Sequence, residues 1–134
     1  MNPITDLDLL LRTMEPVLHP GTFVFASLDA GVTVDPALVL ASIKEPEGLS
    51  VVMRESDAQR YNLHILFRCA WITLSVHSDL EAIGLTAAFA TAMADAAISC
   101  NVVAGAYHDH IFVPIQAADK AMHVLRSLQK STLK

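Results

Sequence analysis

The segments that decide the predicted fold are HSDLEAIGLT (residues 77–86), SCNVVAG (residues 99–105) and HDHIFVP (residues 108–114). Before them, residues 71–76 are aromatic and β-branched, which predicts a strand. Ser78 and Glu81 have the spacing of a capping box, so we expect a long helix that begins at Ser78. Gly84 then falls in the early turns of that helix, and polar groups gather where the strands end.

The rest of this half continues the same pattern of strands and helices. Residues 101–107 and 111–115 predict a hairpin whose turn is His108-Asp109-His110, and residues 117–129 predict a final amphipathic helix. The order is therefore strand, helix, strand, strand, helix. Two helices on one face of an antiparallel sheet form an open α+β two-layer sandwich.

The first half of the chain contains shorter elements. We expect two helices, over residues 5–15 and 35–42, and strands over residues 23–28, 49–53 and 63–67. The last of these and the strand at 71–76 are separated by only three residues, which predicts an antiparallel hairpin. We place the boundary between the halves near this connection, which gives an N-terminal half, 1–67, and a C-terminal half, 68–134.

Composition narrows the class of protein. The chain has 134 residues, of which 53% are hydrophobic and 17% charged, with a net charge of −5. Surplus apolar surface on so short a chain predicts a homodimer. The scattered basic residues argue against nucleic-acid binding, and no stretch is apolar enough for a transmembrane helix. Cys69 and Cys100 lie in apolar segments without CxxC spacing, so we expect buried thiols in a cytoplasmic protein.

Residues 71–88 and 101–114 resemble ACT-domain proteins, and more narrowly a small bacterial group with two ACT-like halves. Residues 14–18 and 23–27 look like the N-terminal half of that group, so the resemblance extends over most of the chain. It implies ferredoxin-like halves, pairing between copies, and binding of a free amino acid at an inter-domain or inter-subunit interface. The implied role is regulation or sensing without catalysis and without a cofactor.

The resemblance also implies which residues form the ligand site. They belong to the loop after the first strand and to a facing strand, and comprise Ser78, Asp79, Leu80, Ile83, Gly84, Asn101, Val102 and Val103. Backbone amides at a helix start bind carboxylates, and Asp79 is suited to an ammonium group. Structural roles fit the same residues, because Ser78 and Asp79 are also good capping residues and Gly84 also suits close packing of helix and strand.

Two alternatives to a ligand-binding regulator remain at this point. The first is an assembly module whose ACT-like surfaces only dimerise or bind a partner. The second is a metal-dependent enzyme that uses His77, His108 and His110, since histidine is a common ligand of divalent metals. A turn at His108-Asp109-His110 that hydrogen-bonds its own backbone would explain the same residues without a metal.

Overall fold

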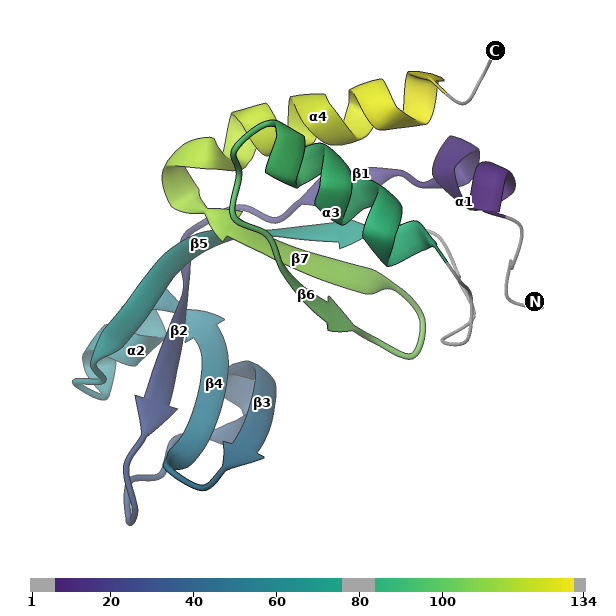
Figure 1. Ribbon diagram of the computed structural model, residues 1–134. Coiled ribbons are helices and arrows are strands. Elements are labelled where there is room, and N and C mark those ends of the chain that lie inside the picture. Colours follow the sequence, from purple (N-terminus) through teal and green to yellow (C-terminus); the bar gives the residue numbers. More distant parts are fainter. Residues whose placement is uncertain (1–6, 76–83, 132–134) are drawn as a thin grey trace. The chain divides into compact units, whose positions relative to one another are not determined.

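The structure, a computed structural model, describes residues 7–75 and 84–131 (Figure 1). Its elements are α1 (Leu7–Thr13), β1 (Pro16–Leu18), β2 (Phe23–Leu28), the 3-10 helix η1 (Pro36–Leu38), β3 (Val39–Glu45), β4 (Gly48–Arg54), α2 (Glu55–Arg60), β5 (Ile65–Leu74), α3 (Leu85–Asp95), β6 (Asn101–Ala104), β7 (Asp109–Pro114), the 3-10 helix η2 (Ile115–Ala117) and α4 (Ala118–Ser131). Among the described helices, none is long and apolar enough to cross a membrane.

The chain forms two compact units that differ from a simple division into two sequence halves. The smaller unit consists of residues 20–69, and the larger unit contains residues up to 19 and from 70 onward. Strand β5 contributes its first residues to the smaller unit and its last residues to the larger one. The predicted boundary between residues 67 and 68 divides the sequence into halves, whereas these units are defined by contacts in space. That boundary therefore stays a prediction.

The smaller unit has four antiparallel strands in the order β3-β4-β2-β5. Its chain order, with η1 after β2 and α2 after β4, is the ferredoxin-like arrangement in which a single 3-10 turn replaces the first helix. The core of this unit is apolar and consists of Val24, Ala26, Leu28, Val51, Met53 and Ala58. The buried Ala58 is the contribution of α2, which is otherwise polar.

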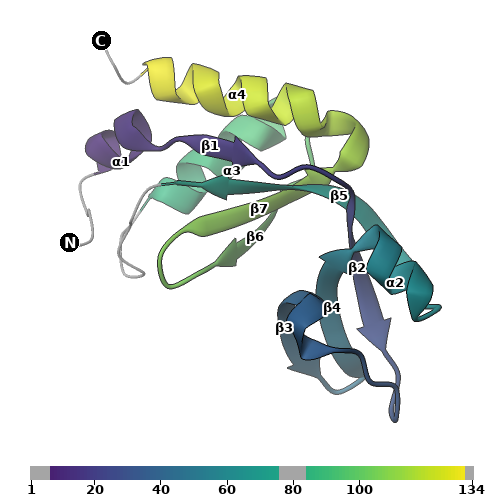
Figure 2. The same cartoon turned by 180° about the vertical axis from the view of Figure 1, so that it is seen from behind.

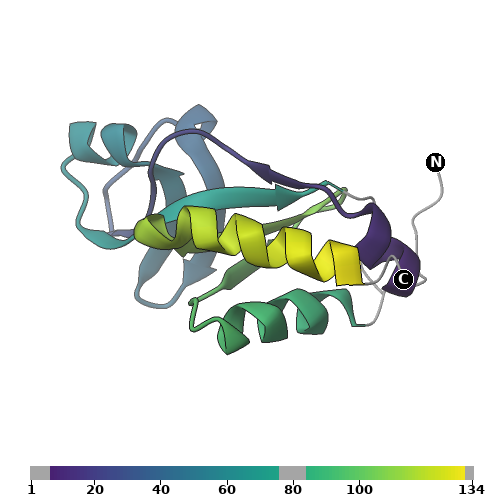
Figure 3. The same cartoon turned by 90° about the horizontal axis from the view of Figure 1, so that it is seen from above.

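The larger unit repeats the arrangement with two full helices. Its strand order is β1-β5-β7-β6, so the N-terminal strand β1 completes the sheet by pairing with β5. Helices α3 and α4 lie on one side of this sheet (Figure 1 and Figure 3), and β1 lies beside β5 (Figure 2). The core is formed by alternate residues of β5 and β7 together with residues of α1, α3 and α4, among them Leu10, Ile72, Phe89, Ile111 and Leu125.

The predicted α+β class, with antiparallel ferredoxin-like halves and helices on one sheet face, is confirmed, but several local predictions were wrong. The hairpin expected around residues 68–70 is one continuous strand, β5. The helix expected over residues 35–42 ends after Leu38, because the residues that follow pair with β4. Helix α2 was missed, since a polar segment with one buried alanine gives no apolar periodicity.

Two predictions near the candidate site also need correction. Helix α3 begins at Leu85 and Gly84 is its N-cap, so Gly84 does not lie inside the helix; the predicted start at Ser78 falls outside the described residues. The turn between β6 and β7 consists of residues 105–108, closed by a hydrogen bond from the Gly105 amide to the His108 carbonyl of 2.8 Å. Asp109 and His110 are therefore strand residues of β7.

Candidate functional site

Gly84 gives the start of α3 its geometry. Its φ of +99° lies in the left-handed region that favours glycine, and α3 has no side-chain cap and no acidic residue in its first turn. The carbonyl of Gly84 accepts the first helical hydrogen bond, from Ala88, at 2.9 Å. The first amides of α3 thus face a position at which Gly84 supplies no capping side chain, and such a helix start favours an anion.

The side chain of Leu7, in helix α1, lies close to this position. A Cβ placed on Gly84 would lie 3.0 Å from Cδ2 of Leu7, which is closer than nine in ten real Cβ contacts. Leu7 itself packs against the core of the larger unit. The close packing that is the alternative role of Gly84 is therefore present, and its partner is a helix from the N-terminal end of the chain.

The other predicted site residues have different places in the structure. Ser78, Asp79, Leu80 and Ile83 lie outside the described residues, as does His77. Asn101, Val102 and Val103 lie on β6, which is an edge strand of the larger unit. Asn101 is exposed, whereas the two valines are half-buried and Val102 packs against the core.

A single copy of the chain does not bring Asn101 next to Gly84. Helix α3 begins at the side on which β6 ends (Figure 1 and Figure 2). Asn101, at the start of β6, is therefore near the opposite end of an 11-residue helix, which is about 16 Å long. One ligand would contact both Gly84 and Asn101 only if a second copy supplied the strand.

The histidines of the metal alternative do not form a ligand group in the part of the chain that the structure describes. No cluster of three His, Cys, Asp or Glu side chains suited to a metal occurs among these residues. His110 instead accepts a hydrogen bond at Nδ1 from the Trp71 indole nitrogen, at 3.1 Å. Burial, followed by the charge of His108, lowers the pKa of His110, and Asp109 opposes this shift.

A polar cluster that the sequence patterns did not predict surrounds His110 on the sheet face away from the helices. Thr73 Oγ1 lies 2.9 Å from Nδ1 of His110 and 2.7 Å from Nε2 of His19. The His19 ring is stacked on Trp71, with ring centroids 3.4 Å apart. The sequence does contain a signal for this cluster, because side chains alternate between the two faces of a strand. Trp71 and Thr73 alternate with the buried apolar residues of β5 and so lie on the opposite face.

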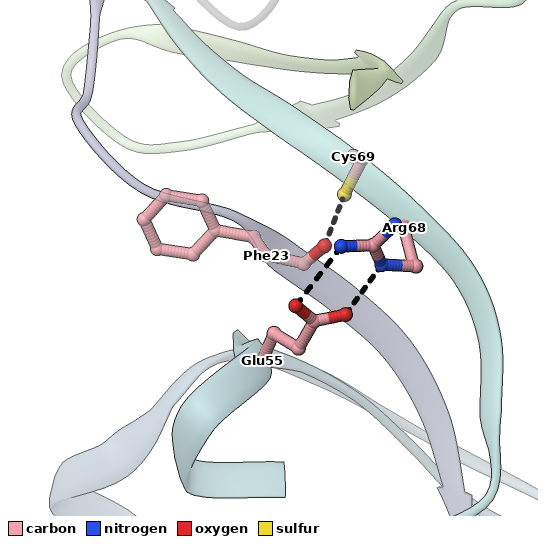
Figure 4. A network of polar contacts seen from close by, with 4 residues as sticks. All are labelled: Phe23, Glu55, Arg68 and Cys69. Atoms are coloured by element: carbon pink, nitrogen blue, oxygen red, sulfur yellow. Dashed lines mark hydrogen bonds and ion pairs between the residues drawn. The ribbon is translucent and has the colours of Figure 1, made fainter. Parts of the chain in front are cut away.

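Another polar network lies within the smaller unit (Figure 4). Arg68 forms a two-pronged ion pair with Glu55, the first residue of α2. The Arg68 side chain lowers the pKa of the Glu55 carboxyl, chiefly through its hydrogen bond. Next to it, the Cys69 thiol donates to the carbonyl of Phe23 at 3.4 Å, and burial raises the pKa of Cys69 to about 12. This network fixes α2 to the sheet and offers no reactive thiolate.

The smaller unit has an apolar hollow of its own. It lies around η1, the element that corresponds to the first helix, α3, of the larger unit. Its volume is about 400 Å³, and its lining residues include Leu28, Val32, Val34, Val39, Leu40 and Leu49. Because η1 is a single turn, the start of a long helix with its row of amides is missing at this place. The two units therefore offer different surfaces despite their shared topology.

Comparison with known proteins places both halves in one family. ACT-domain family models match residues 2–70 and residues 66–127. A structure of a Vibrio cholerae protein described as of unknown function and a possible transport protein is 43% identical, with a TM-score of 0.81; the match covers 92% of this chain and 95% of that one. No protein with a curated function matches in sequence.

Two more distant structures share the fold. A protein from Agrobacterium tumefaciens is 14% identical with a TM-score of 0.68, over 87% of this chain and 89% of that one. The regulatory subunit of aspartate kinase from Thermus thermophilus, in its ligand-free form, is 11% identical with a TM-score of 0.65, over 88% and 97%. With one family model covering more than half of its length and a second following it, the chain belongs to the ACT-domain family.

Proposed function

We propose that this protein binds a free amino acid at the start of α3 and acts as a regulator or sensor rather than as an enzyme. The observation that carries the proposal is Gly84, which holds the N-cap in a left-handed conformation without a capping side chain. We place the ligand carboxylate here, where it accepts hydrogen bonds from the first helical amides, as anions do at helix N-termini.

The remaining groups of the proposed site come from residues that precede Gly84 in the sequence and from a second copy of the chain. Ser78, Asp79, Leu80 and Ile83 surround the ligand, and either the carboxylate of Asp79 or the strand edge at Asn101 binds its ammonium group. The edge strand β6 of the second copy, with Asn101, Val102 and Val103, forms the facing wall. The site thus requires a homodimer, since within one chain Asn101 lies at the other end of α3 from Gly84.

This arrangement explains how a bound amino acid would act on a separate target. A ligand held between two packed surfaces favours the arrangement in which both contact it. The shared fold with an aspartate kinase regulatory subunit supports a regulatory role. We place this role in the cytoplasm and its target on another protein. Cys100 is no candidate nucleophile, because burial raises the pKa of its thiol to about 11.

The test is a thermal-shift screen of the full chain against the twenty amino acids at millimolar concentration. A ligand at a hundredfold excess over its Kd stabilises a protein by about 2.7 kcal/mol, which is readily detected in a small domain. We expect one amino acid or a small group of related ones to raise the Tm of the protein. A carboxylate placed at the anion position, in Gly84→Glu, should abolish that shift.

The matched control is Gly31→Glu, because Gly31 also has a positive φ, of +85°, but no atom lies within 4 Å of the position that a Cβ would take there. Gly31→Glu should keep the ligand-induced shift, and both variants should remain dimers by light scattering. A screen without any stabilising amino acid, with dimerisation intact, would favour the assembly module instead.

A further inference from the structure

The hydrogen bonds of the polar cluster on the sheet face away from the helices run in one direction. It joins three strands, because His19 follows β1, Trp71 and Thr73 belong to β5, and His110 belongs to β7. Thr73 is only 8% exposed, and its hydroxyl lies between the two imidazoles. Hydrogen bonds in such a partly buried site are strong only if each donor meets an acceptor.

The indole of Trp71 fixes the state of His110. An indole nitrogen is always a donor, and it lies 3.1 Å from Nδ1 of His110. Nδ1 must therefore carry its lone pair, which makes His110 neutral with its proton on Nε2. Thr73 is 2.9 Å from the same nitrogen, so its hydroxyl proton also points toward Nδ1.

This assignment determines the role of His19. Because the Thr73 hydroxyl has one proton and directs it to His110, its oxygen accepts from Nε2 of His19, at 2.7 Å. The chain of hydrogen bonds thus runs from His19 through Thr73 to His110, where it meets the bond from Trp71. The His19 ring stacks on the indole of Trp71, which holds it in place for this bond.

The charges around His110 agree with this assignment. Among the described residues, Asp109 on β7 and His108 in the preceding turn are the ionisable neighbours that act on it, and His19 faces it across Thr73. Val103 on β6, which pairs with His110, brings no charge. Partial burial and the charge of His108 lower the pKa of His110 and outweigh the attraction of Asp109.

We propose that His110 is a pH-sensitive switch that holds β1 to the sheet while it is neutral and releases this contact when it is protonated. A proton added at Nδ1 converts the acceptor into a donor that faces the indole N–H of Trp71. That contact becomes repulsive, and a positive charge appears opposite His19. The tie between β1 and β5 at this point, the amide of His19 bonded to the Trp71 carbonyl at 2.9 Å, is then weakened.

The test is NMR of the full chain with nitrogen-15 in its imidazoles, across about pH 5 to 8, where an unperturbed histidine changes charge. We expect His110 to be the Nε2–H tautomer at neutral pH. In Trp71→Phe, which removes the indole donor, the proton affinity of His110 should rise about tenfold, which is one pKa unit. His123, exposed on α4, provides the internal reference signal.

A second pair of variants tests the hydrogen bond between the His19 amide and the Trp71 carbonyl. This test does not require Trp71→Phe to fold. In the wild type and in Thr73→Ser, exchange of the His19 amide, corrected for its intrinsic rate, should accelerate as His110 is protonated. In Thr73→Val, which removes the hydroxyl between the two imidazoles, this dependence should become smaller. A wild-type His110 with its proton on Nδ1, or a His19 amide indifferent to pH, would overturn the proposal. The measurement needs no ligand, so its outcome is independent of the proposed amino-acid site.

Discussion

Leu7 lies against Gly84, so that a Cβ on the glycine would come within 3.0 Å of Cδ2 of the leucine. The two residues are far apart in the chain, yet both are in the larger unit. Helix α1 and strand β1 therefore complete the C-terminal half rather than the N-terminal one. The position that we propose for a ligand carboxylate is therefore shaped by Leu7 of helix α1.

Gly84→Ala should destabilise the protein by about 1–3 kcal/mol, because alanine is strained in the left-handed region. The contact with Leu7 adds to this loss. The measurement is urea unfolding of the variant and the wild type. Gly31→Ala is the matched control. Gly31 has a comparable positive φ, but its new methyl group would lie in open space. Equal losses in the two variants would show that Leu7 does not matter.

Stability should fall in mild acid because of His110. Its folded pKa is lowered, so its contribution is complete above the unfolded value of about 6.5 and is lost as the pH falls through the folded pKa. His110→Asn offers an amide oxygen as acceptor at the place of Nδ1 and does not titrate. Urea unfolding at a series of pH values should show a smaller loss of stability below pH 6.5 for this variant.

The contribution of Asp109 has the opposite sign. Burial raises the pKa of this carboxyl, so the folded state binds its proton more tightly than the unfolded state does. Asp109→Asn, unfolded by urea at the same series of pH values, separates the contribution of Asp109 to stability from that of His110. If His110→Asn and the wild type lost stability in parallel, His110 would not be the group responsible.

Both cysteines should react slowly with thiol reagents in the native protein. Burial raises the pKa of Cys69 to about 12 and that of Cys100 to about 11. At pH 8 only about one Cys100 thiol in a thousand is then a thiolate, the reactive form. The rate of reaction with Ellman's reagent checks this, and urea should release two fast-reacting thiols. Rapid labelling of one thiol without urea would contradict the expected burial.

Glu55→Gln should lower the Tm slightly at neutral pH and low salt, because it breaks the ion pair that joins α2 to β5. The pKa of Glu55 is lowered, so this stabilisation is present above its unfolded pKa of about 4.3 and is lost as the pH falls. Asp57→Asn breaks an ion pair within α2 alone and is the comparison. A Glu55→Gln protein whose Tm equals the wild-type value would count against the expected contribution.

Several elements could be predicted because local rules and tertiary contacts agree there. Residues 23–28 are aromatic and β-branched between turn residues, and they form β2. The last helix was placed at residues 117–129 from its apolar spacing, and α4 is Ala118–Ser131. The family resemblance rested on residues 71–88 and 101–114, and the matching ACT-domain models extend over both halves.

Other elements depend on contacts that no local pattern contains. The polar helix α2 is held by a single fully buried alanine and by the pairing of its first residue with Arg68. The residues after Leu38 extend as β3 because β4 offers a partner along their length. The hairpin at residues 68–70 was predicted from length alone, although the segment has no glycine, proline, asparagine or aspartate to make a turn.

The sequence by itself determined the α+β class, the order of the main elements and the family, because these depend on composition, periodicity and motifs within short segments. Tertiary structure decided that α1 and β1 complete the larger unit, that β5 serves both units, and that His19, Thr73 and His110 meet on one sheet face. The bonds of Thr73 to His110 and to His19 join residues that are 37 and 54 positions apart in the chain. Only the pairing of strands brings such residues within hydrogen-bond distance, and that pairing is a long-range property.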